Sequence, residues 1–100
     1  MKIPKTVKAF GRSYRIIRDN ETTNKMECWG YLDAMRDIIM LRERDLDFTS
    51  GHEKQVFFHE LMHVVDNNFH VGLTEEQIQT MSVGMVTIIE DNQLDFKDEK

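Results

Sequence analysis

The sequence predicts an α+β fold, in which a small, mainly antiparallel sheet of three or four strands packs against two helices. Short apolar segments separated by turn residues occupy residues 7–42, as expected for strands. Two longer segments, about Gly51–Asn67 and Thr74–Asn92, have apolar residues at helical spacing. Strands followed by helices without alternation are typical of α+β proteins. One hundred residues suit a single domain, so we expect residues 1–100 to form one unit.

The first two strands are predicted as a β-hairpin. Val7–Phe10 and Tyr14–Arg18 alternate in part between apolar and polar residues, and Gly11 lies at the turn between them. The polar segment Asp19–Lys25 that follows is predicted to be a loop.

The next two strands are expected at Trp29–Leu32 and Asp37–Arg42, with Asp33–Arg36 turning the chain back. A single helix over Leu32–Arg44 is the alternative, because some of its apolar residues also fit a 3.6-residue period. The β-branched pair Ile38-Ile39 favours the strand. If Asp37–Arg42 lies at the edge of the sheet, it is also a candidate for edge-to-edge dimerisation.

Both helices have recognisable start signals. Ser50-x-x-Glu53 and Thr74-x-x-Gln77 each have the pattern of a capping box. Asn67-Asn68 suit the end of the first helix, because Asn tolerates the left-handed conformation. The apolar stripe of the second helix is expected to comprise Ile78, Met81, Met85, Ile88 and Ile89. Residues 93–100 are expected to be a frayed, charged tail.

The sequence His59-Glu60-Leu61-Met62-His63 within the first helix is the pattern H-E-x-x-H. Residues four apart lie on one helical face, about 5–6 Å from each other. Two imidazoles so placed can both reach one Zn²⁺ ion. Glu60 then stands beside the open coordination position, where it can take a proton from water as a general base.

The surroundings of the motif strengthen the prediction of a metal. Most other faces of the helix are apolar, which is typical of a helix buried on several sides. Two histidines and a glutamate buried there would cost several kcal/mol without partners or a ligand. Metal binding by His59 and His63 would remove that cost.

A third ligand is expected from the start of the second helix, since catalytic zinc usually has three protein ligands. Glu75 lies about 60° from the middle of the inward face of that helix, whereas Glu76 points well outside it. We favour Glu75, with Glu76 and His70 as alternatives. Acidic residues are also common in a first turn because they favour the helix dipole. Asp66 is expected to form a hydrogen bond near the site or the helix end, and His52 is too far upstream to ligate.

Composition excludes several function classes. A net charge of −5 and the lack of a basic run with aromatics argue against a nucleic-acid-binding protein. No apolar run approaches membrane-spanning length, and no signal peptide follows the charged start. The lone Cys28 cannot form an intramolecular disulfide, so we expect a cytoplasmic protein.

Taken together, these motifs resemble a known family. The quoted hairpin and strand patterns, H-E-x-x-H with Asp66, and Leu73-Thr74-Glu75-Glu76 are similar to small phage and prophage proteins related to the ImmA/IrrE and SprT-like zinc metallopeptidases. The resemblance extends from Val7 to Asn92. For a phage-encoded protein it places the chain in the host cytoplasm.

The resemblance implies a minimal zincin-like fold of the gluzincin type, whose edge strand binds a peptide or protein substrate in extended form. It implies zinc held by His59, His63 and Glu75, with Glu60 as general base. Larger zincins add a Tyr or His that stabilises the oxyanion, and Tyr31 is the candidate here. The alternative function is a non-catalytic zinc-binding interaction module of a phage or prophage, with a structural or vestigial site.

Overall fold

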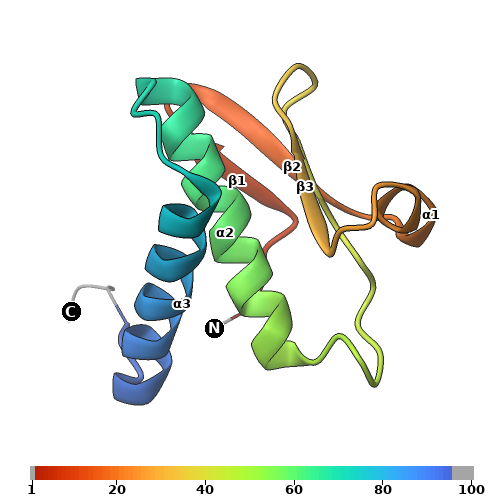
Figure 1. The fold of residues 1–100 in the computed structure, drawn as a ribbon, viewed down its shortest axis with the longest axis vertical. Helices are drawn as coiled ribbons and strands as arrows, with labels where there is room; N and C mark the ends of the chain where they lie inside the picture. Colours follow the sequence, from red (N-terminus) through yellow and green to blue (C-terminus); the bar gives the residue numbers. More distant parts are fainter. Residues whose placement is uncertain (1, 96–100) are drawn as a thin grey trace, which may run out of the picture.

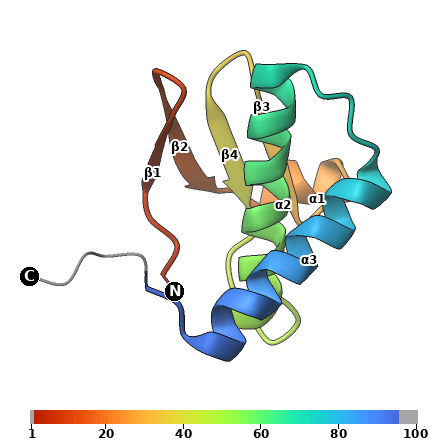
Figure 2. The ribbon, with the colours of Figure 1, turned by 90° about the vertical axis from the view of Figure 1, so that its left-hand side faces the viewer.

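The computed structural model describes residues 2–95 and has an α+β fold. In chain order the elements are β1 (Thr6–Ala9), β2 (Arg12–Arg18), α1 (Asn20–Lys25), β3 (Gly30–Asp33), β4 (Ile38–Leu41), α2 (Ser50–Phe69) and α3 (Glu75–Asn92). Helix α2 packs on one face of the sheet, and α3 packs on α2 (Figures 1 and 2). Residues 96–100 of the expected charged tail lie outside the described residues. None of the helices in residues 2–95 combines the length and the apolar character needed to cross a bilayer.

The sheet has the order β1-β2-β4-β3. The β1/β2 and β3/β4 pairs are antiparallel, and β2/β4 is parallel, so the expectation of a mainly antiparallel sheet is confirmed. The possibility that Asp37–Arg42 lies at an exposed edge, and so offers a site for edge-to-edge dimerisation, is contradicted by this order. The strand that forms within this segment, β4, lies between β2 and β3 in the sheet, and all four residues of β4 are buried. Pairing with β2 on one edge and β3 on the other satisfies its backbone groups, and its continuous apolar run is typical of a buried strand.

The main core lies between the sheet and α2. Tyr14, Ile39 and Leu41 from the strands meet Phe57 and Val64 from α2. The only polar group of this cluster is the Tyr14 hydroxyl, which accepts a hydrogen bond from the Asn68 side chain at 3.1 Å. These contacts fix the position of α2 on the central strands of the sheet. They therefore also fix the distance between the polar side chains of α2 and strand β3.

Gly30 allows β3 to approach α2 closely. A Cβ atom at Gly30 would lie 2.6 Å from Val56 Cγ1, 3.2 Å from Leu41 Cδ2 and 3.3 Å from the Met40 carbonyl oxygen. Val56 is β-branched and has few alternative rotamers, so it cannot easily move aside.

We therefore expect Gly30→Ala to lower the free energy of unfolding by about 1–3 kcal/mol, the usual cost of overpacking. Gly84→Ala is the matched control, because a Cβ there meets nothing within 4 Å. Alanine at this mid-helix position should raise stability by up to about 1 kcal/mol. Urea unfolding of both variants measures the contrast, and an equally stable Gly30→Ala would contradict the close packing.

Asp19–Lys25 was expected to be a loop, but its last six residues form α1. Asp19 is the N-cap, and its carboxylate accepts hydrogen bonds from the Thr22 backbone N–H (3.1 Å) and the Thr22 hydroxyl (2.8 Å). These bonds hold the pKa of Asp19 below its ordinary value, chiefly through the Thr22 side chain. A short polar helix has no apolar stripe, so only its capping residue could have indicated it.

The ends of α2 also differ from expectation. Thr49, not Ser50, is the N-cap, and its side chain accepts from the His52 N–H. The helix ends at Phe69, and left-handed His70 is the C-cap, whose backbone N–H donates to the Asp66 carbonyl. Asn68 lies within the helix, and its side-chain amide donates to the Tyr14 hydroxyl and the Val64 carbonyl. For α3, the Thr74–Gln77 capping box is confirmed.

The expected apolar stripe of α3 is only partly correct. Ile78, Ser82 and Val86 are the buried residues, whereas Met81, Met85 and Ile88 are about half exposed. The reason is that α3 packs on α2 and not on the sheet, so only a narrow stripe at four-residue spacing is covered.

Candidate metal centre

His59 and His63 lie one turn apart on α2, on the face turned toward β3 and the start of α3. Their ring centroids are 5.0 Å apart. Both side chains are largely covered, with 16% exposure for His59 and 28% for His63. A helix uninterrupted from Ser50 to Phe69 is what keeps the two imidazoles on one face.

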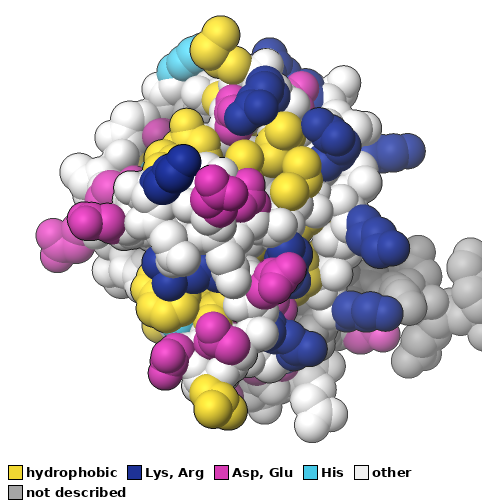
Figure 3. Space-filling model, turned by 90° about the vertical axis from the view of Figure 1, so that its right-hand side faces the viewer, with side chains coloured by type: hydrophobic (Ala, Val, Ile, Leu, Met, Phe, Trp, Pro, Cys, Tyr) yellow, Lys and Arg dark blue, Asp and Glu magenta, His cyan; other side chains and the backbone are white. Residues whose placement is uncertain are grey.

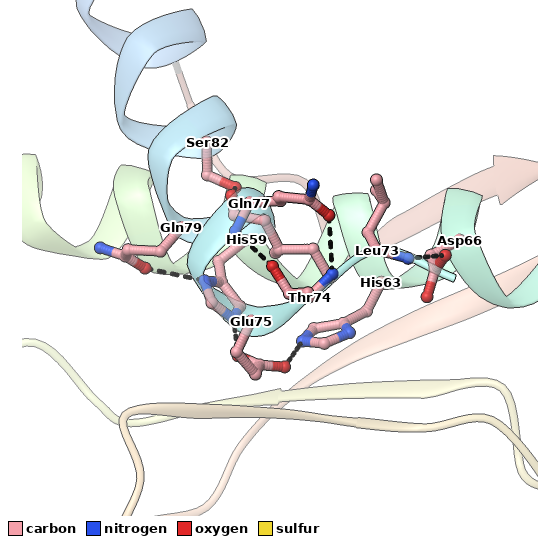
Figure 4. A network of polar contacts seen from close by, with 10 residues as sticks. His59, His63, Asp66, Leu73, Thr74, Glu75, Gln77, Gln79 and Ser82 are labelled. Carbon is pink, nitrogen blue, oxygen red and sulfur yellow. Dashed lines mark hydrogen bonds and ion pairs between the residues drawn. The ribbon is translucent and has the colours of Figure 1, made fainter. Parts of the chain in front are cut away.

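Glu75 reaches both imidazoles from the first residue of α3 (Figure 4). One carboxylate oxygen, Oε2, lies 3.0 Å from His59 Nε2, and the other, Oε1, lies 2.8 Å from His63 Nε2. The Thr74–Gln77 capping box holds the residues on either side of Glu75, so the start of α3 is fixed where the carboxylate can bridge the two rings.

These three side chains fit a zinc ion. Two imidazole nitrogens and one carboxylate oxygen lie within 4.8 Å of one another. Two His and one Glu form one of the usual donor sets of catalytic zinc. The Glu75 carboxylate lies within hydrogen-bond distance of both imidazoles, so the three side chains meet at one place.

Gln79 is a part of this cluster that the sequence did not suggest. Its Oε1 lies 2.8 Å from His59 Nδ1. A protonated Nδ1 donating to this amide oxygen leaves Nε2 free to ligate, and such partners commonly orient histidine ligands. The available signal was position, because Gln79 follows Glu75 by four residues and shares its helical face.

Asp66 ties the loop between the helices to α2. Its Oδ1 accepts hydrogen bonds from the backbone N–H groups of Gly72 (2.8 Å) and Leu73 (3.0 Å). This agrees with the expected bond near the helix end. The loop leads directly into Thr74 and Glu75, so Asp66 helps to place the third side chain of the cluster (Figure 4).

Comparisons with protein-family models, curated proteins and solved structures find no match to this chain.

Glu60 is the buried carboxylate of the centre. It is 5% exposed, lines the same cleft as the two histidines, and forms no hydrogen bond or ion pair within residues 2–95. Burial raises its pKa to about 7, with His59 lowering and Glu75 raising it to smaller degrees. A carboxylate without a structural partner, buried beside two imidazoles, is available for chemistry.

The rival ligands lie elsewhere. Glu76 is exposed and outside the cluster. His70 is exposed at the left-handed C-cap of α2. His52 packs against Trp29 at 4.8 Å and Phe48 at 5.1 Å between ring centroids, so it belongs to an aromatic cluster at the start of α2.

A cleft of about 700 Å³ runs between β3, α2 and the start of α3, within the size range of ligand sites. Tyr31 lines it, as does Trp29, which sequence reasoning did not place there. The described residues that line it are Cys28, Trp29, Gly30, Tyr31, Leu32, Ala34, His52, Gln55, Val56, His59, Glu60, His63, Asp66, Asn67, Glu75 and Gln79.

Proposed function

We propose that the protein is a zinc-dependent metallopeptidase with a minimal zincin-like fold, and that α2 is its active-site helix. The observation that carries the proposal is the convergence of His59, His63 and Glu75 from two helices within 4.8 Å, beside buried Glu60. Zinc would be held by these three residues and, when bound, supplies a Lewis acid that acidifies water and polarises a carbonyl oxygen.

The residues of the chain then have separate roles. Glu60 takes the proton of the attacking water and passes it to the amine that leaves when the peptide bond breaks. Gln79 fixes the tautomer and orientation of His59. Tyr31 lines the cleft and is the candidate group for stabilising charge on the carbonyl oxygen.

The position of β3 supports a peptide as the substrate class. It is an edge strand of the sheet, and its residues line the cleft beside the histidines. An edge strand offers unpaired backbone N–H and C=O groups, with which an extended peptide can form main-chain hydrogen bonds. A peptide so bound lies within the cleft that contains Glu60.

The test combines metal content with hydrolysis of an unfolded protein such as casein. We expect one zinc per chain by elemental analysis, hydrolysis that a chelator removes, and recovery when zinc is restored. Zinc binding without hydrolysis would contradict the proposal and favour a non-catalytic interaction module. Absence of zinc would contradict both.

A further inference from the structure

The two ends of the cleft differ in chemistry, and Trp29 forms the apolar end. Its ring stacks on Phe48 at 5.1 Å, and the guanidinium of Arg42 lies 4.4 Å from its ring centroid. The Arg42 backbone N–H also donates to the Trp29 carbonyl oxygen at 3.0 Å. These contacts fix the indole as a rigid wall of the cleft, which suits a large apolar side chain.

Asp66 forms the other end. Two backbone N–H groups fix its Oδ1, whereas its Oδ2 has no hydrogen-bond or ion-pair partner within residues 2–95. Glu60 and Glu75 also line the cleft, but both have roles in the proposed centre. Asp66 is therefore the cleft carboxylate that is held rigidly and keeps one oxygen for a ligand.

The charge of the cleft points to cationic ligands. No Lys or Arg is among the described residues that line it. Ten of the 13 Lys and Arg belong to residues 1–44, whereas 12 of the 18 Asp and Glu belong to residues 45–100. On the face drawn in Figure 3, Lys and Arg gather mainly toward the right-hand side, and the far left carries Asp and Glu. An acidic cleft attracts basic side chains and repels acidic ones.

The spacing of the two ends suits an extended peptide. Along α2, His52 beside Trp29 and Asp66 are separated by about 21 Å, at 1.5 Å per residue. An extended chain rises about 3.3 Å per residue, so about six residues span the cleft. Asp66 is one helical turn beyond His63, so a residue close to the bond to be cleaved would reach it.

We propose that the cleft selects extended cationic peptides, with a Lys or Arg side chain bound by Asp66 and a large apolar side chain packed against Trp29. This selectivity would define the substrate class of the proposed peptidase. Cleavage of the bound peptide rests on that proposed function. Binding itself requires no hydrolysis and can be measured separately.

The test measures the affinity of three labelled ten-residue peptides by fluorescence anisotropy, with and without zinc. They are identical, with one Leu, except that the residue six positions after Leu is Lys, Gln or Glu, which matches the spacing of the two ends of the cleft. Trp29 is the only tryptophan, so its emission gives a second readout from inside the cleft. We expect the Lys peptide to bind about three- to fivefold more tightly than the Gln peptide, as for a partly exposed ion pair. The Glu peptide should bind most weakly.

Asp66→Asn tests the residue, because Asn keeps an oxygen for the Gly72 and Leu73 N–H groups while losing the charge. It should remove the preference for Lys over Gln and leave the affinity for the Gln peptide within about twofold. Asp91→Asn, an exposed change of equal charge outside the cleft, should leave the preference intact. Equal binding of the Lys and Glu peptides, no binding of any peptide, or a preference that survives Asp66→Asn would overturn the proposal. Selective binding without cleavage would overturn only the peptidase function.

Discussion

The Glu60→Gln variant is expected to bind zinc as tightly as the wild type and to lose hydrolysis of casein by at least about 100-fold, the lower range for removing a general base. Glutamine fills the same space but cannot accept a proton from water. Within residues 2–95 the hydrogen bonds and ion pairs of the proposed ligands involve Gln79 and one another and not Glu60, so the metal site should be unchanged. A neutral amide is also less costly to bury than a carboxylate, so the variant should fold at least as stably.

The measurements are initial rates of casein hydrolysis, zinc content by elemental analysis, and the unfolding midpoint in urea. Glu76→Gln is the matched control, because it makes the same chemical change at an exposed position outside the cluster. It should retain wild-type rates. Hydrolysis that persists in Glu60→Gln would remove Glu60 from the mechanism, whereas lost zinc would make its role structural.

The Glu75→Ala variant is expected to weaken zinc binding by more than about 100-fold, because even groups that only orient zinc ligands contribute about 10- to 100-fold. Glu75 is the only carboxylate of the described residues that lies within hydrogen-bond distance of both imidazoles. Its side chain is 70% exposed and lies at a helix start, so its removal leaves no buried cavity. The fold should survive while the metal is lost.

Competition with a chromophoric chelator gives the zinc Kd. Glu76→Ala is the control, because Glu76 also lies in the first turn of α3 and has a similar interaction with the helix dipole. The zinc Kd of Glu76→Ala should stay within about twofold of the wild-type value, because this variant lacks only an exposed surface charge. Equal loss in both variants would assign the effect to the helix start, and an unchanged Kd in Glu75→Ala would exclude Glu75 as a ligand.

Local signals in the sequence were sufficient for several elements. The β1–β2 hairpin, the β3–β4 turn and the cap of α3 depend on residues close together in the chain, so their residue types indicated them. The ends of α2 were less well predicted, because Thr49 and His70 compete there with equally suitable neighbours. Helix α1 was missed because it is short and polar.

Packing between distant segments was harder to predict. The interior position of β4 depends on its parallel pairing with β2, which local sequence does not encode. The exposure of Met81, Met85 and Ile88 depends on how α3 lies on α2. Trp29 is held at the cleft by contacts with Arg42, Phe48 and His52, which lie 13 to 23 residues further along the chain.

For the candidate site, the sequence by itself determined that His59 and His63 share one face of a helix with Glu60 between them, because helical spacing is a local property. It also favoured Glu75 over Glu76 from helical position alone. Only the tertiary structure decided that the Glu75 carboxylate contacts both imidazoles and that the Gln79 side chain contacts the His59 ring. It alone also decided that Asp66 and Trp29 line the cleft. These contacts join side chains from separate elements, and their distances are set by the packing of α3 on α2 and of α2 on the sheet.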